Sequence, residues 1–199
     1  MRRIILASTS KRREELLKLL DLKFEVIPSS YEEDMSLELP PEGLVKTFAL
    51  GKAKDVAKKE KGVIIGVDTI VVHDKKNIGK PKDSEDAKRM LKKFSGKEHH
   101  VYSGIAIIDT ETGNEIVDHE VTKVFLREMS DEEIDSYVAT KEPLDKAGAY
   151  GIQGIGSIFV SRVEGCYFNV VGLPLANLEK NLRILGINIF EYEKVNRNP

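Results

Sequence analysis

Residues 63–72 read Val-Ile-Ile-Gly-Val-Asp-Thr-Ile-Val-Val, a run that is apolar on both faces and rich in β-branched side chains. Such a run is typical of a strand buried in the middle of a sheet. Asp68 is the exception within it. A buried, unpaired carboxylate is so costly that Asp68 requires a metal, a cation or a hydrogen-bond network, unless it caps a neighbouring loop at a bulge. The run therefore predicts a central strand and makes Asp68 a candidate functional residue.

Helices and strands are mixed on either side of this run. Residues 101–109 and 115–126 flank the turn 110–114 and predict a β-hairpin. Other strands are predicted over residues 3–7, 24–28, 157–163 and 167–171. Helices are predicted around residues 14–20, 44–57 and 84–94, after the capping box Ser130-Asp131-Glu132-Glu133, and from Pro174 onward as the final helix. We therefore expect an α/β fold with a mixed β-sheet flanked by helices.

The composition narrows the class of protein. At 199 residues the chain suits one domain over residues 1–193, followed by a polar tail at 194–199. A formal net charge of −2 argues against a general nucleic-acid surface. The single cysteine, Cys166, excludes an internal disulfide and suits a reducing cytosol. Since no apolar run is long enough for a signal peptide or a membrane span, we expect a cytoplasmic protein.

A glycine-rich segment stands out near the middle of the second half of the chain. Residues 145–156 read Asp-Lys-Ala-Gly-Ala-Tyr-Gly-Ile-Gln-Gly-Ile-Gly. These glycines disfavour a helix, and the apolar residues between them argue against a flexible linker. Glycine lets the backbone approach a ligand closely, and Asp145, Lys146 and Gln153 supply charge and amide groups. We interpret the segment as one wall of a site for a small polar ligand, with a tight loop between packed elements as the alternative.

Three further motifs offer charged groups. Residues 8–13, Ser-Thr-Ser-Lys-Arg-Arg, place cations at a helix start, which favours an anionic ligand, although a solvated basic turn explains the motif equally well. Gly79-Lys80-Pro81 presents a lysine on a turn. Residues 32–34, Glu-Glu-Asp, offer carboxylates for a hard cation such as Mg²⁺, or simply form a solvated loop. Taken together with the glycine segment, these motifs suit phosphoryl chemistry.

In these motifs the chain resembles the Maf family of nucleoside triphosphate pyrophosphatases, over essentially its whole length. The matching segments are residues 6–17, Asp68-Thr69, 79–81, 95–97, 141–154 and 171–174. The resemblance implies hydrolysis of a nucleoside triphosphate to the monophosphate and pyrophosphate, with a divalent cation, Mg²⁺ or Mn²⁺. It also implies an elongated, two-lobed fold similar to the inosine-triphosphate pyrophosphatases, and a homodimer.

The resemblance also implies roles for individual residues. Asp68 is the implied proton acceptor, and it shares the metal with Glu33. The implied substrate-binding residues are Ser8, Arg13, Lys52 and Lys80. Beside them, we expect Asp145 and Lys146 of the glycine-rich segment to bind the substrate near its phosphate end. Base preference is implied for Arg12, Thr69 and Gln153, whose identities are similar to those of the dTTP/UTP branch.

The sequence is also compatible with other functions. One is house-cleaning of modified pyrimidine nucleotides, and another is hydrolysis of non-canonical purine nucleotides or 7-methyl-GTP. A third, of a different class, is a nucleotide-sensing regulator of cell division or septum formation. Since a pure sensor has no use for a water-activating base, the set of Asp68, Glu33 and Lys80 favours an active enzyme.

Overall fold

The computed structural model describes residues 2–194, so the tail predicted at 194–199 lies outside the described residues except for Lys194. The strands of this part of the chain form one seven-stranded sheet, in the order β2-β1-β3-β5-β6-β7 with β4 paired to β3. They are β1 (Ile4–Ala7), β2 (Phe24–Val26), β3 (Val63–His73), β4 (Lys76–Ile78), β5 (Glu98–Asp109), β6 (Glu115–Leu126) and β7 (Val160–Glu164). The pairs β1–β2 and β1–β3 are parallel, whereas β3–β4 and β6–β7 are antiparallel. The predicted mixed sheet is confirmed.

Helices occur between and after the strands. The α-helices are α1 (Lys11–Lys18), α2 (Pro41–Ala57), α3 (Ser84–Phe94), α4 (Asp131–Ala139), α5 (Tyr167–Val171), α6 (Leu175–Ile184) and α7 (Ile189–Lys194). Three short 3₁₀ turns are η1 (Glu142–Asp145), η2 (Ala147–Ala149) and η3 (Ile155–Phe159). The predicted capping box opens α4: Ser130 accepts from the Glu133 backbone N–H, and the Glu133 side chain accepts in return from the Ser130 N–H. No helix of residues 2–194 has the length and apolarity that crossing a bilayer requires.

Several predicted elements are wrong. Residues 167–171 form α5 and not a strand, β7 begins only at Val160 after the turn η3, and α7 follows the helix that was predicted to be final. Tertiary contacts explain α5: Nδ2 of the buried Asn169 donates to Val101 O at 2.9 Å and to Thr122 Oγ1 at 3.0 Å. These contacts outweigh the β-propensity of a short apolar run. The predicted turn before Pro81 also contains the short strand β4.

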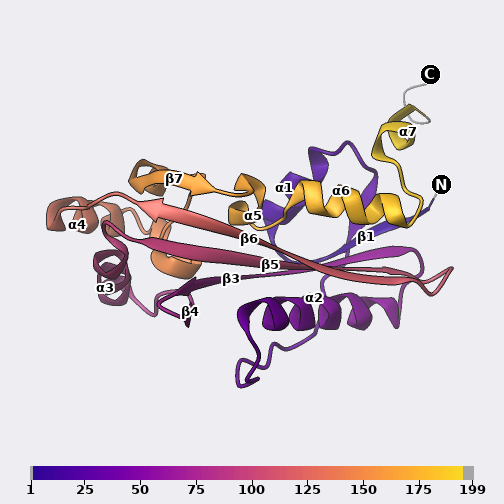
Figure 1. Cartoon of the computed structure of the whole chain (residues 1–199), viewed down its shortest axis with the longest axis horizontal. Helices are drawn as coiled ribbons and strands as arrows, with labels where there is room; N and C mark the ends of the chain where they lie inside the picture. The colour runs from indigo at the N-terminus through magenta and orange to yellow at the C-terminus, as the bar shows by residue number, and fades with distance from the viewer. Residues whose placement is uncertain (1, 195–199) are drawn as a thin grey trace. The chain divides into compact units, whose positions relative to one another are not determined.

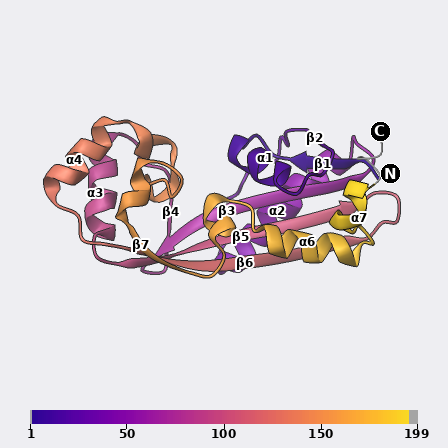
Figure 2. The same ribbon diagram turned by 90° about the horizontal axis from the view of Figure 1, so that it is seen from above.

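The chain divides into two compact units. Unit 1 comprises residues 1–69, 103–120 and 172–199. In unit 1, α2 covers one face of the strands and α1 and α6 lie on the other face (Figures 1 and 2). Its buried side chains include Ile5, Ile64 and Ala106 from three strands, packed with Ala49 and Ala53 of α2. The single domain predicted over residues 1–193 stays a prediction.

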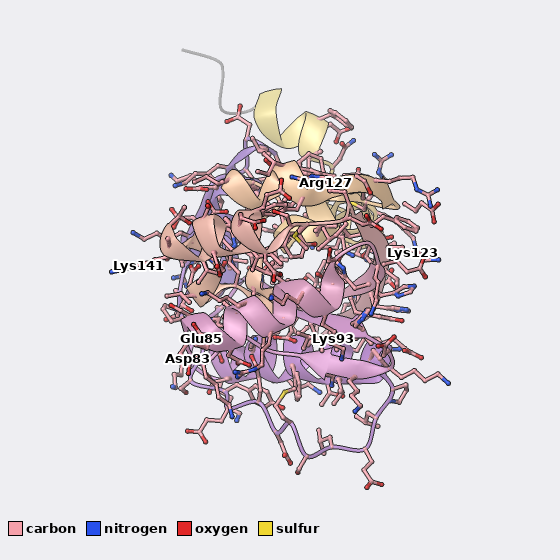
Figure 3. All side chains as sticks on the ribbon, turned by 90° about the vertical axis from the view of Figure 1, so that its left-hand side faces the viewer. Asp83, Glu85, Lys93, Lys123, Arg127 and Lys141 are labelled. Carbon is pink, nitrogen blue, oxygen red and sulfur yellow. The ribbon has the colours of Figure 1, made fainter. Side chains whose placement is uncertain are left out.

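Unit 2 comprises residues 70–102 and 121–171. Helices α3 and α4 pack against each other there, and Phe94, Tyr137, Tyr150 and Phe159 are among the buried side chains. The helix α3 matches its prediction of 84–94. Figure 3 looks onto this unit and labels Asp83 and Glu85 at the start of α3 and Lys93 near its end, the distribution of charge that the helix dipole favours.

Two glycines set the distance between α2 and the sheet of unit 1. A Cβ at Gly66 of β3 would overlap the carbonyl of Ala49, and one at Gly104 of β5 would overlap the carbonyl of Val45. Both obstacles are backbone atoms of α2, so no side chain can rotate away to make room. The close approach of α2 to β3 places the helix that carries Lys52 beside the strand that carries Asp68.

Replacing Gly66 by alanine should lower the free energy of unfolding by about 3 kcal/mol, since overpacking displaces a helix from the sheet. Urea unfolding followed by circular dichroism measures the change. Gly79→Ala is the matched control, because a Cβ there meets nothing within 4 Å. Equal unfolding midpoints for the two variants would contradict the close approach of α2.

Candidate active site

Three charged side chains meet in unit 1. Nζ of Lys52 lies 2.6 Å from Oδ1 of Asp68 and 2.6 Å from Oε1 of Glu33. The side chain of Lys52 is 15% exposed and that of Asp68 is 6% exposed, so the pair lies largely out of water. One ammonium group thus joins two carboxylates, which brings together three of the residues expected from the sequence.

The two carboxylates differ in their proton affinity. Burial raises the pKa of Asp68 above its ordinary value, and the ammonium of Lys52 only partly opposes this shift. Burial also acts to raise the pKa of Glu33, but the hydrogen bond and charge of Lys52 outweigh it and hold that pKa below its ordinary value. Because a raised pKa makes a carboxylate the better proton acceptor, Asp68 is the stronger base of the two.

Glu33 reaches Lys52 because the loop before α2 is fastened to that helix. Oδ2 of Asp55 accepts hydrogen bonds from the hydroxyl groups of Ser29 at 2.9 Å and Ser30 at 3.0 Å. The ring of Tyr31 lies so close to Gly51 that any Cβ there would overlap it. The sequence gives no sign of these contacts, since an acidic loop does not reveal where it is attached.

Arg13 of α1 is fixed by three acceptors of unit 1. Its Nε donates to Gly172 O at 2.9 Å, its Nη1 to Val67 O at 3.0 Å and its Nη2 to Thr69 Oγ1 at 3.0 Å. Burial lowers the pKa of Arg13, and the charges of Asp68 and Glu33 oppose that shift. Arg13 therefore belongs to the same cluster, in which two cations balance two carboxylates.

The hydroxyl group of Thr69 is occupied by the chain itself. Besides accepting from Arg13, its Oγ1 lies 2.8 Å from Ser103 Oγ and 3.4 Å from Gly172 O. Ser103 is fully buried on β5. Sequence reasoning missed Ser103 because a single serine within a strand carries no distinguishing pattern. The part of Thr69 in base preference stays a prediction.

Ser8 and Arg12 stand near the start of α1. Ser8 directly follows β1, is buried, and accepts a hydrogen bond from Ser10 N at 3.1 Å. Ser10 in turn caps the helix by accepting from Arg13 N at 3.5 Å. Arg12 is exposed on the first turn. The expected grouping of hydroxyls and cations at a helix start is thus present, in an arrangement that suits anions.

The remaining candidates belong to unit 2: Lys80, Asp145, Lys146 and Gln153. The turn that carries Lys80 lies beside the turn η2, because Gly148 N donates to Gly79 O at 3.1 Å. Nζ of Lys146 donates to Asp145 Oδ1 at 2.7 Å and to Glu142 O at 2.9 Å, so these neighbours already engage its charge. Lys80 and Gln153 are exposed.

The glycines of residues 148–156 face side chains of the chain itself. A Cβ at Gly151 would lie 2.7 Å from Lys146 Cε, one at Gly154 would lie 2.5 Å from the Glu142 carboxyl group, and one at Gly148 would lie 3.0 Å from the Phe94 ring. Gly148 also has a φ of +77°, which disfavours other residues. These glycines let the segment close on its own side chains, as the tight-loop alternative predicted, and a ligand is not needed to explain them.

The two carboxylates of unit 1 fit a divalent cation. Oδ2 of Asp68 is buried and has no hydrogen-bond partner within the described part of the chain. A buried carboxylate oxygen of this kind is costly unless a cation or water meets it. Residues 2–194 contain no group of three or more His, Cys, Asp or Glu side chains placed to hold a metal. Glu33 and Asp68 match the one or two carboxylates that Mg²⁺ uses together with substrate phosphates.

A mixed β-sheet with flanking helices, on which two carboxylates and two cations form one cluster, defines a class of protein suited to phosphoryl chemistry. The profile of the Maf-like protein family matches residues 3–185, and the chain belongs to that family.

Relatives in this family are similar over nearly their whole length. The dTTP/UTP pyrophosphatase of Alkaliphilus oremlandii is 54% identical over 185 residues, which cover 92% of this chain and 96% of that protein. The dTTP/UTP pyrophosphatase of Acetivibrio thermocellus is 49% identical, over 96% of this chain and 99% of that protein. A solved dITP/XTP pyrophosphatase from Mycobacterium abscessus aligns with 64% of this chain and 75% of its own, at 18% identity and a TM-score of 0.42.

Proposed function

We propose that this protein hydrolyses dTTP and UTP to the nucleoside monophosphate and pyrophosphate. The observation that carries this proposal is the Asp68–Lys52–Glu33 cluster, a buried base held by a cation at 2.6 Å. The relatives at about half identity are named dTTP/UTP pyrophosphatases, which supports the same substrates for this chain. Modified pyrimidine triphosphates fall within the same proposal.

In the proposed mechanism, water attacks the α-phosphorus in line with the departing pyrophosphate. Asp68 accepts a proton from this water as the new P–O bond forms, and the bond from the α-phosphorus to the bridging oxygen breaks with its electron pair on pyrophosphate. Arg13 and Lys52 stabilise the charge that develops on the phosphoryl oxygens. The family resemblance assigns the same task to Lys80, with Ser8 as a further substrate contact. Asp145 and Lys146 of the glycine-rich segment are proposed to bind near the phosphate end of the substrate.

A divalent cation, Mg²⁺ or Mn²⁺, would be held by Glu33 and Asp68 and would neutralise phosphate charge. The charge balance of the cluster supports this requirement. Since Arg13 and Lys52 are already balanced by Glu33 and Asp68, the cluster has no net positive charge to offer a triphosphate. A divalent cation held by Glu33 and Asp68 would supply that charge.

Base preference is proposed for Arg12, Thr69 and Gln153. The amide of Gln153 can both donate and accept, which suits the O4 and N3–H of thymine or uracil. A homodimer and a cytoplasmic location, expected from the family resemblance and the single cysteine, are further predictions.

A pyrophosphate-release assay over a panel of nucleoside triphosphates tests the proposal, with Mg²⁺ and Mn²⁺ each added and then removed by chelation. We expect dTTP and UTP to be hydrolysed fastest and chelation to stop turnover. Faster hydrolysis of 7-methyl-GTP or of inosine triphosphate would contradict the proposed substrates. Nucleotide binding without turnover would favour the regulator of cell division or septum formation, for which a pull-down would then identify a partner.

A further inference from the structure

The carboxylate of Glu142 in unit 2 holds the loop of residues 151–156 by hydrogen bonds. Oε2 of Glu142 accepts from Ile155 N at 2.8 Å, and Oε1 accepts from Gly156 N at 3.0 Å and from the Tyr137 hydroxyl at 2.9 Å. That hydroxyl also accepts from Gly151 N at 3.2 Å. Glu142 and Tyr137 therefore accept hydrogen bonds from backbone N–H groups at both ends of residues 151–156.

The fit between this loop and Glu142 is close. A Cβ at Gly154 would overlap the carboxyl group of Glu142, and one at Gly156 would overlap the hydroxyl of Tyr137. Burial acts to raise the pKa of Glu142, but the N–H groups of Gly156 and Ile155 outweigh it and hold that pKa below its ordinary value. The ionised form is thus the one that the loop binds. A carboxylate accepting several N–H bonds fixes backbone strongly, because charge-assisted hydrogen bonds are the stronger kind.

The loop held in this way carries Gln153. That residue is exposed and lies between Gly151 and Gly154, the two glycines that pack on Lys146 and Glu142. Figure 3 labels Lys141, the residue before Glu142, at the edge of unit 2. Lys141 has a φ of +66° and directly precedes the turn η1, so the backbone turns sharply just before Glu142. The position of Gln153 therefore depends on the anchor that this turn presents.

We propose that Glu142 is a positioning residue for base discrimination: its carboxylate fixes residues 151–156 and thereby holds Gln153 where the nucleobase is read. This inference rests on the proposed function, since it assigns a task to the residue proposed to read the base. The Glu142 carboxylate is engaged by Ile155 N, Gly156 N and the Tyr137 hydroxyl, so its role is to position the loop and not to take part in the chemical step. It acts on the KM and on the choice of base, whereas Asp68 acts on turnover.

The test is the Glu142→Gln variant of the full chain. Glutamine keeps one acceptor oxygen but turns an N–H group toward the backbone N–H of Ile155 or Gly156, so one contact becomes repulsive. We expect the KM for dTTP to rise about tenfold and the preference for dTTP over dCTP to fall about tenfold, with kcat at saturation nearly kept. Hydrogen exchange of the 151–156 amides should accelerate. Glu128→Gln, an exposed carboxylate of the same unit, is the control and should behave as wild type.

A merely structural role predicts something different. Partial unfolding would lower the apparent kcat for every nucleotide equally and leave the KM and the dTTP/dCTP preference unchanged, and that result would overturn the inference. If Glu142→Gln does not fold, Tyr137→Phe serves as the second variant, because it removes one donor to the carboxylate. It should also raise the KM for dTTP and lower the preference for dTTP over dCTP, but by less. A wild-type protein that hydrolyses none of these nucleotides would overturn the proposed function and this inference with it. An active Glu142→Gln variant with wild-type KM and preference would overturn the inference alone.

Discussion

Replacing Asp68 by asparagine is expected to lower kcat for dTTP hydrolysis by about 10³-fold, the contribution typical of a general base. Asparagine keeps the shape of the side chain but cannot accept the proton of the attacking water. The substrate contacts proposed for Arg13 and the other cations remain, so binding of dTTP should be largely kept. Pyrophosphate release measures kcat, and isothermal titration of dTTP in the presence of Mg²⁺ measures binding.

The matched control is Asp21→Asn, an exposed position in the same unit. Asp21 has a φ of +51°, a conformation that asparagine adopts readily, so this variant should fold and turn over as wild type. Near-normal pyrophosphate release by Asp68→Asn would contradict the assignment of Asp68 as the general base.

Replacing Lys52 by methionine should lower kcat/KM by about 10²-fold, because one stabilising cation is lost from the transition state. The same variant should lose about 3 kcal/mol of folding free energy, since removing one partner of a buried ion pair leaves Asp68 without its cation. Both effects follow from one position, the Nζ that lies 2.6 Å from each carboxylate. Urea unfolding and the pyrophosphate assay measure them separately.

Two further variants isolate the cause of that instability. Adding Asp68→Asn to Lys52→Met removes the unpaired carboxylate, so part of the lost stability should return. Lys54→Met is the control on the same helix, because Lys54 is 52% exposed and forms a surface ion pair with Glu115 at 3.2 Å. If Lys52→Met and Lys54→Met were equally stable and equally active, the buried ion pairs of Lys52 would contribute neither to stability nor to activity.

The fold could be predicted where local chemistry decides it. The run of β3, the hairpin of β5 and β6, the helix α3 and the capping box of α4 all follow from periodicity and from cap residues that act within a few positions. The helix α5 could not, because Asn169 takes its partners from Val101 and Thr122, far away in the sequence. A short apolar run does not reveal such contacts.

The residues of the candidate site could likewise be predicted only in part from the sequence. Asp68 could be predicted because a carboxylate is out of place in an apolar strand. Glu33 was a candidate only as one of three carboxylates in an acidic run, and Lys52 became a candidate only through the family resemblance. Ser103 and Glu142 could not be singled out, since their importance lies in what they touch. The glycines near Glu142 show most clearly what the sequence could not predict. Their spacing indicated a close approach but not which atoms approach each other.

Hydrolysis of dTTP in water enriched in oxygen-18 tests the central claim most directly. If water attacks the α-phosphorus beside Asp68, the label appears in thymidine monophosphate, and the pyrophosphate carries none. Mass spectrometry of the two products after a single round of hydrolysis gives the answer. Label in the pyrophosphate, with none in the monophosphate, would show attack at the β-phosphorus and contradict the account.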